Sequence, residues 1–200
     1  MAISVPLVTD RADTDAALVE QYLAGDAAAF TELMQAHENR VFGICLRMLR
    51  DREAALDATQ ETFITVFRKA DRFAGRSAFS TWLYRVAVNT CYDQARRTRR
   101  RQADPLPEGR DPADPSAGDL LEAVEVRPDI QRALDALPAE FRAAVVLADL
   151  EGLALQTVGE ILGVPVGTVK SRVFRGRRLL AETLGNRDGV ARPPRDEHDA

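Results

Sequence analysis

The sequence has few of the residues on which catalytic and metal sites depend. Its 200 residues include two cysteines and two histidines, and neither cysteine stands in a CxxC motif or a Cys/His cluster. Zinc sites and disulfide frameworks need several such residues at short spacings. We therefore expect Cys45 and Cys91 to be buried free thiols. Because no nucleophile, metal or phosphate-loop pattern surrounds His37 or His198, we expect no catalytic residue, no metal and no cofactor.

Long apolar runs are also absent. Uncharged runs such as Ala143 to Ala148 are far shorter than the roughly 20 residues that span a bilayer. The N-terminus has no basic segment leading into an apolar one, as a secretory signal would. These absences predict a cytoplasmic protein that does not insert into membranes.

Charge is present but unevenly distributed. The net charge of −4 hides two basic segments: residues 92–101 hold five arginines and one acid, and residues 167–178 hold five basic residues and no acid. Between them, residues 103–126 hold seven acids and one arginine. Clustered cations are the electrostatic footprint of nucleic-acid binding, so the two basic segments are candidate DNA-binding sites despite the acidic total.

Hydrophobic residues recur at helical spacing, and no alternating strand-like run occurs, so the fold is predicted to be all-α. In the first half, Gly25 ends one helix, Asp26 caps a second that reaches about Leu49, and Asp51 caps a third that reaches about Ala70. A fourth is expected at about 78–99, capped by Ser77 or Ser80. In the second half, three short helices, punctuated by Pro138 and Gly152, precede a longer one at about 167–184.

Composition divides the chain into two small helical domains. Residues 102–127 are rich in proline, glycine, aspartate and alanine without hydrophobic spacing, which predicts a flexible acidic linker. We expect a disordered N-terminus at 1–13, a first domain at 14–101, a second at 128–185 and a disordered tail at 186–200.

The second domain carries a helix-turn-helix pattern. Val158 and Leu162 anchor its first helix, Gly163 makes the turn, Val164 enters the core and Thr168 is expected to cap the recognition helix. A glycine within the first helix, at position 159, is expected to mark close helix packing. The outer face of the second helix carries short polar and cationic side chains that suit phosphates and base edges, namely Thr168, Lys170, Ser171, Arg172 and Arg175. The alternative is a basic, solvated helix of an ordinary bundle.

Two further surfaces stand out in the first domain. Phe73 and Phe79 flank a loop ahead of the arginine cluster, and aromatic rings beside cations hold single-stranded nucleic acid. Trp82 is expected in the core, and the arginines alone would also suit a helix C-terminus. One polar face of the third helix carries Asp57, Gln60 and Glu61. The alternative interpretation is an ordinary exposed surface that only keeps the protein soluble.

Taken together, these pieces resemble a known family. The run DATQETFITVFRKADRFAGRSAFSTWLYRVAVNTCYDQARR resembles the second conserved region of extracytoplasmic-function (ECF) sigma factors, and LPAEFRAAVVLADLEGLALQTVGEILGVPVGTVKSRVFRGRRLL resembles their fourth region. The two occur in the family's order. The resemblance implies a dissociable, non-enzymatic subunit that binds RNA polymerase core, recognises −35 and −10 promoter elements, helps to melt the promoter and is regulated by an anti-sigma factor.

The resemblance also implies roles for particular residues. Core binding through the β and β′ subunits, with a clamp-helix contact on β′, falls to Asp57, Gln60, Glu61, Phe63 and Phe67. Binding of the single-stranded −10 element falls to Phe73, Arg76, Ser77, Phe79, Thr81, Arg85, Asn89, Arg96 and Arg97. Reading of the double-stranded −35 element falls to Thr168, Lys170, Ser171, Arg172, Phe174 and Arg175.

Two other classes of function remain open from the sequence. A stand-alone helix-turn-helix transcriptional regulator would use the first domain for dimerisation or ligand sensing and would bind an operator without polymerase. A protein-interaction adaptor would use the helical surfaces alone, and its activity would not depend on the charge of the recognition helix.

Overall fold

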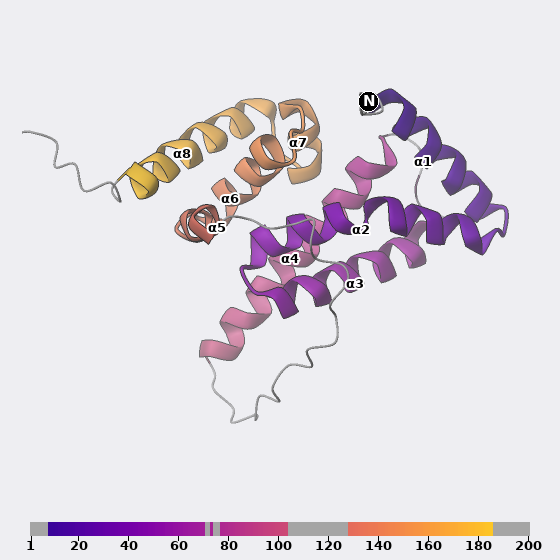
Figure 1. Ribbon diagram of the computed structural model, residues 1–200, viewed down its shortest axis with the longest axis horizontal. Coiled ribbons are helices and arrows are strands. Elements are labelled where there is room, and N and C mark those ends of the chain that lie inside the picture. Colours follow the sequence, from indigo (N-terminus) through magenta and orange to yellow (C-terminus); the bar gives the residue numbers. More distant parts are fainter. Residues whose placement is uncertain (1–7, 71–72, 74–76, 104–127, 186–200) are drawn as a thin grey trace, which may run out of the picture.

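The computed structural model describes residues 8–70, 73, 77–103 and 128–185. These residues form helices joined by short turns, with no strand among them, which confirms the all-α prediction. The first group comprises α1 (Val8–Leu23), α2 (Ala27–Leu49), α3 (Arg52–Lys69) and α4 (Phe79–Ala103), and the second comprises α5 (Pro128–Asp135), α6 (Ala139–Val145), η2 (Val146–Leu150), α7 (Leu155–Leu162) and α8 (Val166–Gly185) (Figure 1). The predicted linker, apart from its first two residues in α4, and the predicted tail lie outside the described residues.

The two aspartate caps form as predicted. The Asp26 side chain accepts a hydrogen bond from the Ala28 backbone N–H at 2.9 Å, and the Asp51 side chain accepts one from the Ala54 N–H at 2.8 Å. Each satisfies a donor that the first turn of the helix leaves unpaired. Gly25, with a φ of 105°, makes the turn between α1 and α2 in a region that favours glycine.

Three predicted boundaries were wrong. Helix α1 already begins at Val8, so residues 8–13 are helical, because extending an established helix adds one hydrogen bond per residue. The Ala78 carbonyl accepts the first hydrogen bond of α4, from Trp82 N–H at 3.2 Å, so neither Ser77 nor Ser80 is the cap. The Pro165 carbonyl accepts from Thr168 and Val169 at the start of α8, which places Thr168 inside the first turn.

The first group is a bundle built around α2, which packs against α1, α3 and α4. Its interior is apolar and includes Val41, Ile44 and Leu83. Cys45 and Cys91 are both buried there as free thiols, as predicted. A hydrogen bond from the Cys91 thiol lowers the pKa of Cys45, and the same bond, together with burial, raises the pKa of Cys91 well above its usual value.

The second group contains the predicted helix-turn-helix, formed by α7 and α8. Gly163 turns the chain between them with a φ of 66°, and Val164 packs against the core. Gly159 lies where the two helices approach: a Cβ there would stand 2.9 Å from the Val164 carbonyl oxygen. The close packing expected at this glycine is therefore confirmed. Between Pro138 and Gly152 the chain forms one continuous helical segment, in which α6 passes directly into the π-helical turn η2.

A second glycine marks the crossing of α6 and α8. A Cβ at Gly176 would lie 2.6 Å from Cγ2 of Val145 and 3.5 Å from the Phe141 carbonyl oxygen, whereas a Cβ at Gly167 would meet nothing within 4 Å. We expect Gly176→Ala to lower the free energy of unfolding by about 1–2 kcal/mol, because overpacking outweighs the gain in helix propensity. Gly167→Ala, the control, should leave it unchanged or raise it by up to ~1 kcal/mol. Urea denaturation measures both, and equal effects would contradict the packing assignment.

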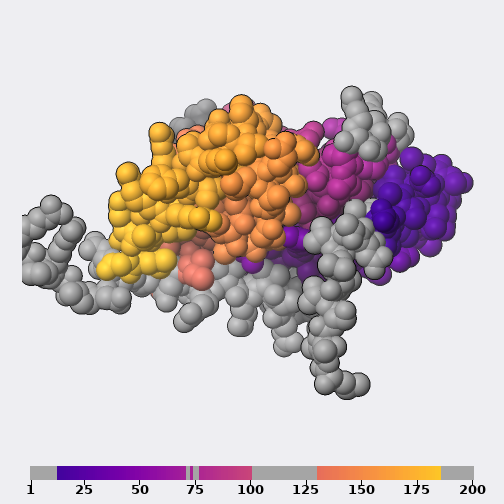
Figure 2. All heavy atoms as spheres, turned by 90° about the horizontal axis from the view of Figure 1, so that it is seen from above, coloured from indigo at the N-terminus to yellow at the C-terminus, as the bar shows by residue number. Residues whose placement is uncertain are grey.

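The two groups pack against each other in one continuous apolar cluster. Leu147 and Val158 of the second group belong to the same cluster as Ile44 and Leu83 of the first, and α7 lies directly on α4. In the space-filling view, the orange part of the second group rests against the magenta part of the first (Figure 2). The sequence does not predict how the two groups are arranged, whereas in the structure they are packed against each other.

Candidate functional sites

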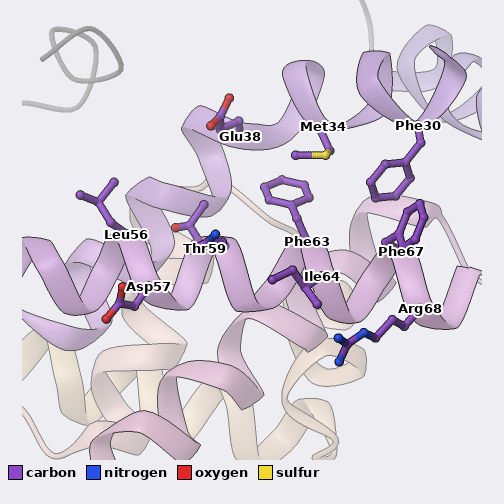
Figure 3. A pocket seen from close by; sticks show the side chains of 11 residues that line it. Phe30, Met34, Glu38, Leu56, Asp57, Thr59, Phe63, Ile64, Phe67 and Arg68 are labelled. Atoms are coloured by element: carbon purple, nitrogen blue, oxygen red, sulfur yellow. The ribbon is translucent and has the colours of Figure 1, made fainter. Parts of the chain in front are cut away.

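The polar face of α3 borders an apolar groove between α2 and α3. Asp57 and Gln60 are exposed and Glu61 is half-buried. The groove has a volume of about 700 Å³, and Asp57 and Gln60 line it together with Phe30, Met34, Glu38, Leu56, Thr59, Phe63, Ile64, Phe67 and Arg68 (Figure 3). The predicted core-binding residues thus come together, except Glu61, which does not line the groove.

Apolar side chains stay exposed at the rim of this groove. Phe63 is 6% exposed, but Ile64 and Phe67 are 42% and 52% exposed. The Phe67 ring centroid lies 5.2 Å from that of Phe30 and 5.7 Å from that of Tyr22, so the exposed ring is held in place. Apolar surface beside carboxylates, held rigid and open to solvent, is typical of a protein-docking site.

An aromatic cluster stands at the start of α4. The ring of Phe73 lies 5.7 Å from Phe79 and 5.4 Å from Trp82. Phe79 is only 4% exposed and packs against His37, whereas Phe73 and Trp82 are half-buried. Trp82 packs against the core, as expected, although it is only partly buried. The expectation that Phe79 lies at the surface was wrong, because the first residue of α4 points inward.

The other predicted −10 residues differ in exposure. Thr81 is buried, Ser77 and Arg85 are half-buried and Asn89 is exposed; Arg76 lies outside the described residues. Nε of Arg85 is buried and has no hydrogen-bond partner among the described residues. These residues share one stretch of chain, but in this conformation only part of the set is open to a ligand.

The described part of the arginine cluster lies on the C-terminal half of α4. Arg96 and Arg97 are exposed and each pairs with a carboxylate: Arg96 with Asp93 of its own helix, and Arg97 with Glu61 of α3 at 3.5 Å. Exposed pairs of this kind are weak and readily exchanged for other anions. The pair with Glu61 also joins the predicted core-binding face to the predicted −10 surface.

Helix α8 presents the predicted −35 residues on its outer face. Lys170, Ser171 and Arg175 are exposed and Phe174 is 69% exposed, while Val169 and Val173 face the core. Thr168 and Arg172 are half-buried. Burial raises the pKa of Tyr92 on α4, and the positive charge of Arg172 opposes that rise.

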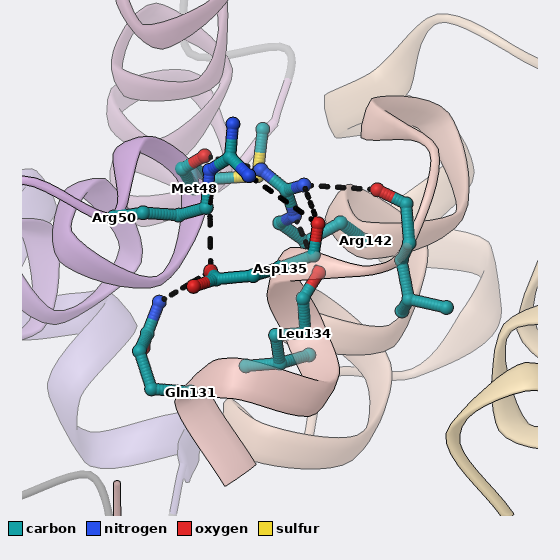
Figure 4. Close-up of polar contacts among 7 residues, drawn as sticks. Met48, Arg50, Gln131, Leu134, Asp135 and Arg142 are labelled. Carbon is teal, nitrogen blue, oxygen red and sulfur yellow. Dashed lines mark hydrogen bonds and ion pairs between the residues drawn. The ribbon is translucent and has the colours of Figure 1, made fainter. Parts of the chain in front are cut away.

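Sequence reasoning missed a buried arginine that joins the two groups. Arg142 is 6% exposed and donates hydrogen bonds to the carbonyl oxygens of Met48 at 2.8 Å, Leu134 at 2.8 Å, Leu137 at 2.9 Å and Asp135 at 3.2 Å (Figure 4). Burial, followed by the charge of Arg50, lowers its pKa. The signal was a lone cation within the apolar run after Pro138, since a buried charge must find partners.

Among the described residues, no group of histidine, cysteine, aspartate and glutamate side chains is arranged to hold a metal ion. Within the same part of the chain, no helix is both long and apolar enough to cross a bilayer.

Comparison with known proteins identifies both groups of helices. The family model for sigma-70 region 2 matches residues 33–101, and that for sigma-70 region 4 matches residues 127–180. The chain is 43% identical over 166 residues to the ECF RNA polymerase sigma factor SigE of Mycolicibacterium smegmatis, covering 80% of this chain and 64% of SigE. It is 38% identical over 172 residues to the ECF sigma factor SigM of Mycobacterium tuberculosis, covering 86% of this chain and 85% of SigM.

Solved structures agree with the sequence relatives. The sigma factor RpoE of Bartonella quintana, in complex with the anti-sigma factor NepR, superposes with a TM-score of 0.63 at 26% identity, covering 78% of this chain and 96% of RpoE. CnrH, in complex with the cytosolic domain of CnrY, shares the fold with a TM-score of 0.65 at 22% identity, covering 87% of this chain and 99% of CnrH. The chain therefore belongs to the extracytoplasmic-function family of RNA polymerase sigma factors.

Proposed function

We propose that this protein is a promoter-specificity subunit. It binds the β and β′ subunits of RNA polymerase core and directs initiation at promoters with particular −35 and −10 elements. One observation supports this most strongly. A single chain carries an exposed, cationic recognition helix and, on another domain, an open apolar groove beside Asp57 and Gln60. A DNA-reading face and a separate protein-docking face on one chain are what such a subunit needs.

The −35 step uses the outer face of α8. Lys170 and Arg175 reach phosphates and guanine edges, Ser171 adds a short hydrogen-bonding group, and the exposed ring of Phe174 suits the methyl group of thymine. Val169 and Val173 are buried on the opposite face and anchor the helix to the core of its domain. Sequence reading in this step falls to Thr168, Lys170, Ser171, Arg172, Phe174 and Arg175.

The −10 step uses the start of α4 and the loop before it. Phe73 and Trp82 offer half-buried rings on which an unpaired base can stack, and the buried ring of Phe79 packs against both. Thr81 lies in the same turn of α4 and completes the predicted pocket. Arg85 and Asn89 on the next turns, and Arg96 and Arg97 further along, bind the backbone of the separated strand. Stacking on extruded bases favours the melted promoter over the duplex.

No chemical step is assigned to the chain: it acts by binding, and the polymerase that it accompanies in the cytoplasm performs the catalysis. Regulation by an anti-sigma factor is part of the proposal. It is supported by the likeness to RpoE, whose solved structure contains the anti-sigma factor NepR.

Run-off transcription with purified core polymerase tests this function. With a panel of promoters, the protein should create start sites that are absent with core alone. Arg175→Ala should lower transcription about tenfold, corresponding to the 1–3 kcal/mol of a base-reading contact, whereas Arg178→Ala, an exposed neighbour outside the predicted set, should have little effect.

The docking face is tested separately by measuring affinity for core. Asp57→Ala and Gln60→Ala should weaken core binding, and Glu53→Ala, exposed on the same helix, should not. Absence of any protein-dependent start site, together with no core binding, would refute the proposal. Tight operator binding without polymerase would instead support a stand-alone regulator.

A further inference from the structure

A buried polar pair joins α1 to α2 beneath the start of α4. Nε2 of His37 lies 2.9 and 3.0 Å from the two carboxylate oxygens of Asp15, and the side chains of His37 and Asp15 are 2% and 3% exposed. Because Nε2 is within hydrogen-bond distance of both oxygens, the imidazole ring cannot turn without losing these contacts. We call these two residues the Asp15–His37 pair.

The imidazole ring is in contact with the aromatic cluster at the start of α4. Its centroid lies 5.7 Å from that of Phe79, and the Phe79 centroid lies 5.7 Å from that of Phe73 and 5.9 Å from that of Trp82. Phe73 and Trp82 are half-buried. Phe79 and His37 are 4% and 2% exposed. The pair therefore lies under the rings on which an unpaired base is proposed to stack, and Phe79 connects the two.

Phe79 depends on such a support because it is the first residue of α4. The first N–H groups of a helix have no partner within the helix, and neither Ser77 nor Ser80 caps this end. The position of the Phe79 ring is therefore set by tertiary packing more than by its own helix. His37 provides a surface of fixed orientation for that packing.

Stability alone does not explain why this buried site is polar. Taking a carboxylate out of water is costly, and apolar residues of similar volume are often at least as stable as a buried ion pair. Hydrogen bonds differ from apolar contacts because they have direction. A fully paired buried polar group therefore favours one arrangement of the side chains around it over others. The side chains packed on the Asp15–His37 pair are the rings of the aromatic cluster.

We propose that the Asp15–His37 pair is a positioning element of the −10 site, which holds Phe79 and, through it, the two stacking rings in the arrangement that accepts an unpaired base. Both members of the pair are too deeply buried to touch DNA themselves. The role in DNA binding rests on the proposed function, whereas the ordering of the rings does not. Without the pair, the base-accepting arrangement is one of several, and the apparent affinity for the separated strand falls in proportion to its population.

A double substitution separates positioning from stability. Asp15→Ala with His37→Phe removes both polar groups together, keeps a ring against Phe79 and roughly conserves the buried volume. Its thermal midpoint should therefore stay close to that of the natural chain. Asp15→Asn is the conservative variant, because it retains an oxygen that accepts a hydrogen bond from Nε2. Thr62→Val is the matched control, because it removes a buried hydroxyl of α3 that donates to the Ala58 carbonyl.

Fluorescence of the full chain tests the ordering of the rings without polymerase. Trp82 is the single tryptophan of the protein, so its emission reports the aromatic cluster directly. In the double variant, the emission should shift to longer wavelength and acrylamide should quench it more strongly, because the ring of Trp82 contacts water more often. Asp15→Asn and Thr62→Val should keep the natural spectrum. An unchanged spectrum in the double variant would overturn the positioning role.

Promoter binding by the holoenzyme tests the consequence for function. The probes derive from a promoter found by run-off transcription: one has a single-stranded −10 element, and the other is a duplex with the −35 element alone. Holoenzyme with the double variant should bind the first probe about tenfold more weakly, as when a base loses its stacking surface. Its binding of the −35 duplex, and the affinity of the double variant for core, should match those of the natural chain.

The conservative variant and the natural chain complete the test. Asp15→Asn should retain most of the −10 binding, because the hydrogen bond to the imidazole is kept. Full −10 binding by the double variant, or an equal loss in Asp15→Asn, would overturn the proposal. If the natural chain directs initiation at no promoter, the proposed function fails, while the fluorescence of Trp82 still decides whether the pair orders the rings.

Discussion

Replacing Arg142 with methionine is expected to lower the free energy of unfolding by about 3–5 kcal/mol, the largest effect of any single substitution considered. The guanidinium binds four carbonyl oxygens, three at the end of α5 and one, that of Met48, at the end of α2. Methionine fills much of the same volume but donates nothing, so the Met48 and Leu137 carbonyls lose the guanidinium as a donor. The Leu134 and Asp135 carbonyls keep only their bonds from Leu137 N–H and from Arg50. Thermal and urea denaturation of the full chain provide the measurement.

Two other variants separate the hydrogen bonds of Arg142 from its charge and volume. Arg142→Lys keeps the charge but cannot reach four oxygens with one ammonium group, so most of the loss should remain. Arg178→Met removes an arginine that is 66% exposed on α8 and should change stability by no more than about 0.5 kcal/mol. Full stability of Arg142→Lys would show that charge alone, and not the forked geometry, is what the site requires.

Replacing Asp15 with alanine is expected to cost about 2–4 kcal/mol. Both oxygens of Asp15 lie within hydrogen-bond distance of Nε2 of His37, at 3.0 and 2.9 Å, and both residues are 2% exposed. The ring of His37 packs in turn against Phe79, below the predicted −10 surface. Without Asp15, Nε2 of a fully buried imidazole loses its partner, and the contact that ties α1 to α2 is lost.

Hydrogen exchange and thermal denaturation distinguish this loss from a general weakening. Protection should fall first in α1, since α1 loses its buried polar anchor. Asp15→Asn retains an oxygen acceptor and should lose less than Asp15→Ala. Asp13→Ala, an exposed position on the same helix, should be nearly neutral. Equal losses at positions 13 and 15 would show that the pair is not the anchor.

Sequence reasoning predicted most of the helices because their signals are local. Asp26 and Asp51 cap helices through contacts two or three residues away, and Gly163 makes its turn with its own backbone. The errors came where several residues could serve the same local role. All three expected caps, Ser77, Ser80 and Thr168, have side chains suited to that role. The burial of Phe79 instead makes α4 begin at Phe79, and the fixed backbone of Pro165 makes α8 begin directly after it.

The contacts between the domains were beyond such reasoning. The Met48 carbonyl that binds Arg142 is 94 residues away in sequence, and Arg40 binds Glu151 across 111 residues. Helical spacing indicates which face of a helix is apolar but not which partner covers it. For the same reason, the family resemblance assigned Asp57, Gln60, Glu61, Phe63 and Phe67 to core binding, but the groove that four of them line with Phe30 and Met34 of α2 emerged only from the structure.

The rate at which a thiol reagent labels Cys45 and Cys91 can be used to measure motion of the first domain. Both thiols are enclosed between α2 and α4, at 0% and 1% exposure, so a thiol reagent can reach them only when these helices part. The rate at which the intact protein is labelled therefore measures how often its interior opens, and no probe has to be introduced. Compared between the free protein and its complex with polymerase core, that rate would report whether core binding makes the first domain more rigid.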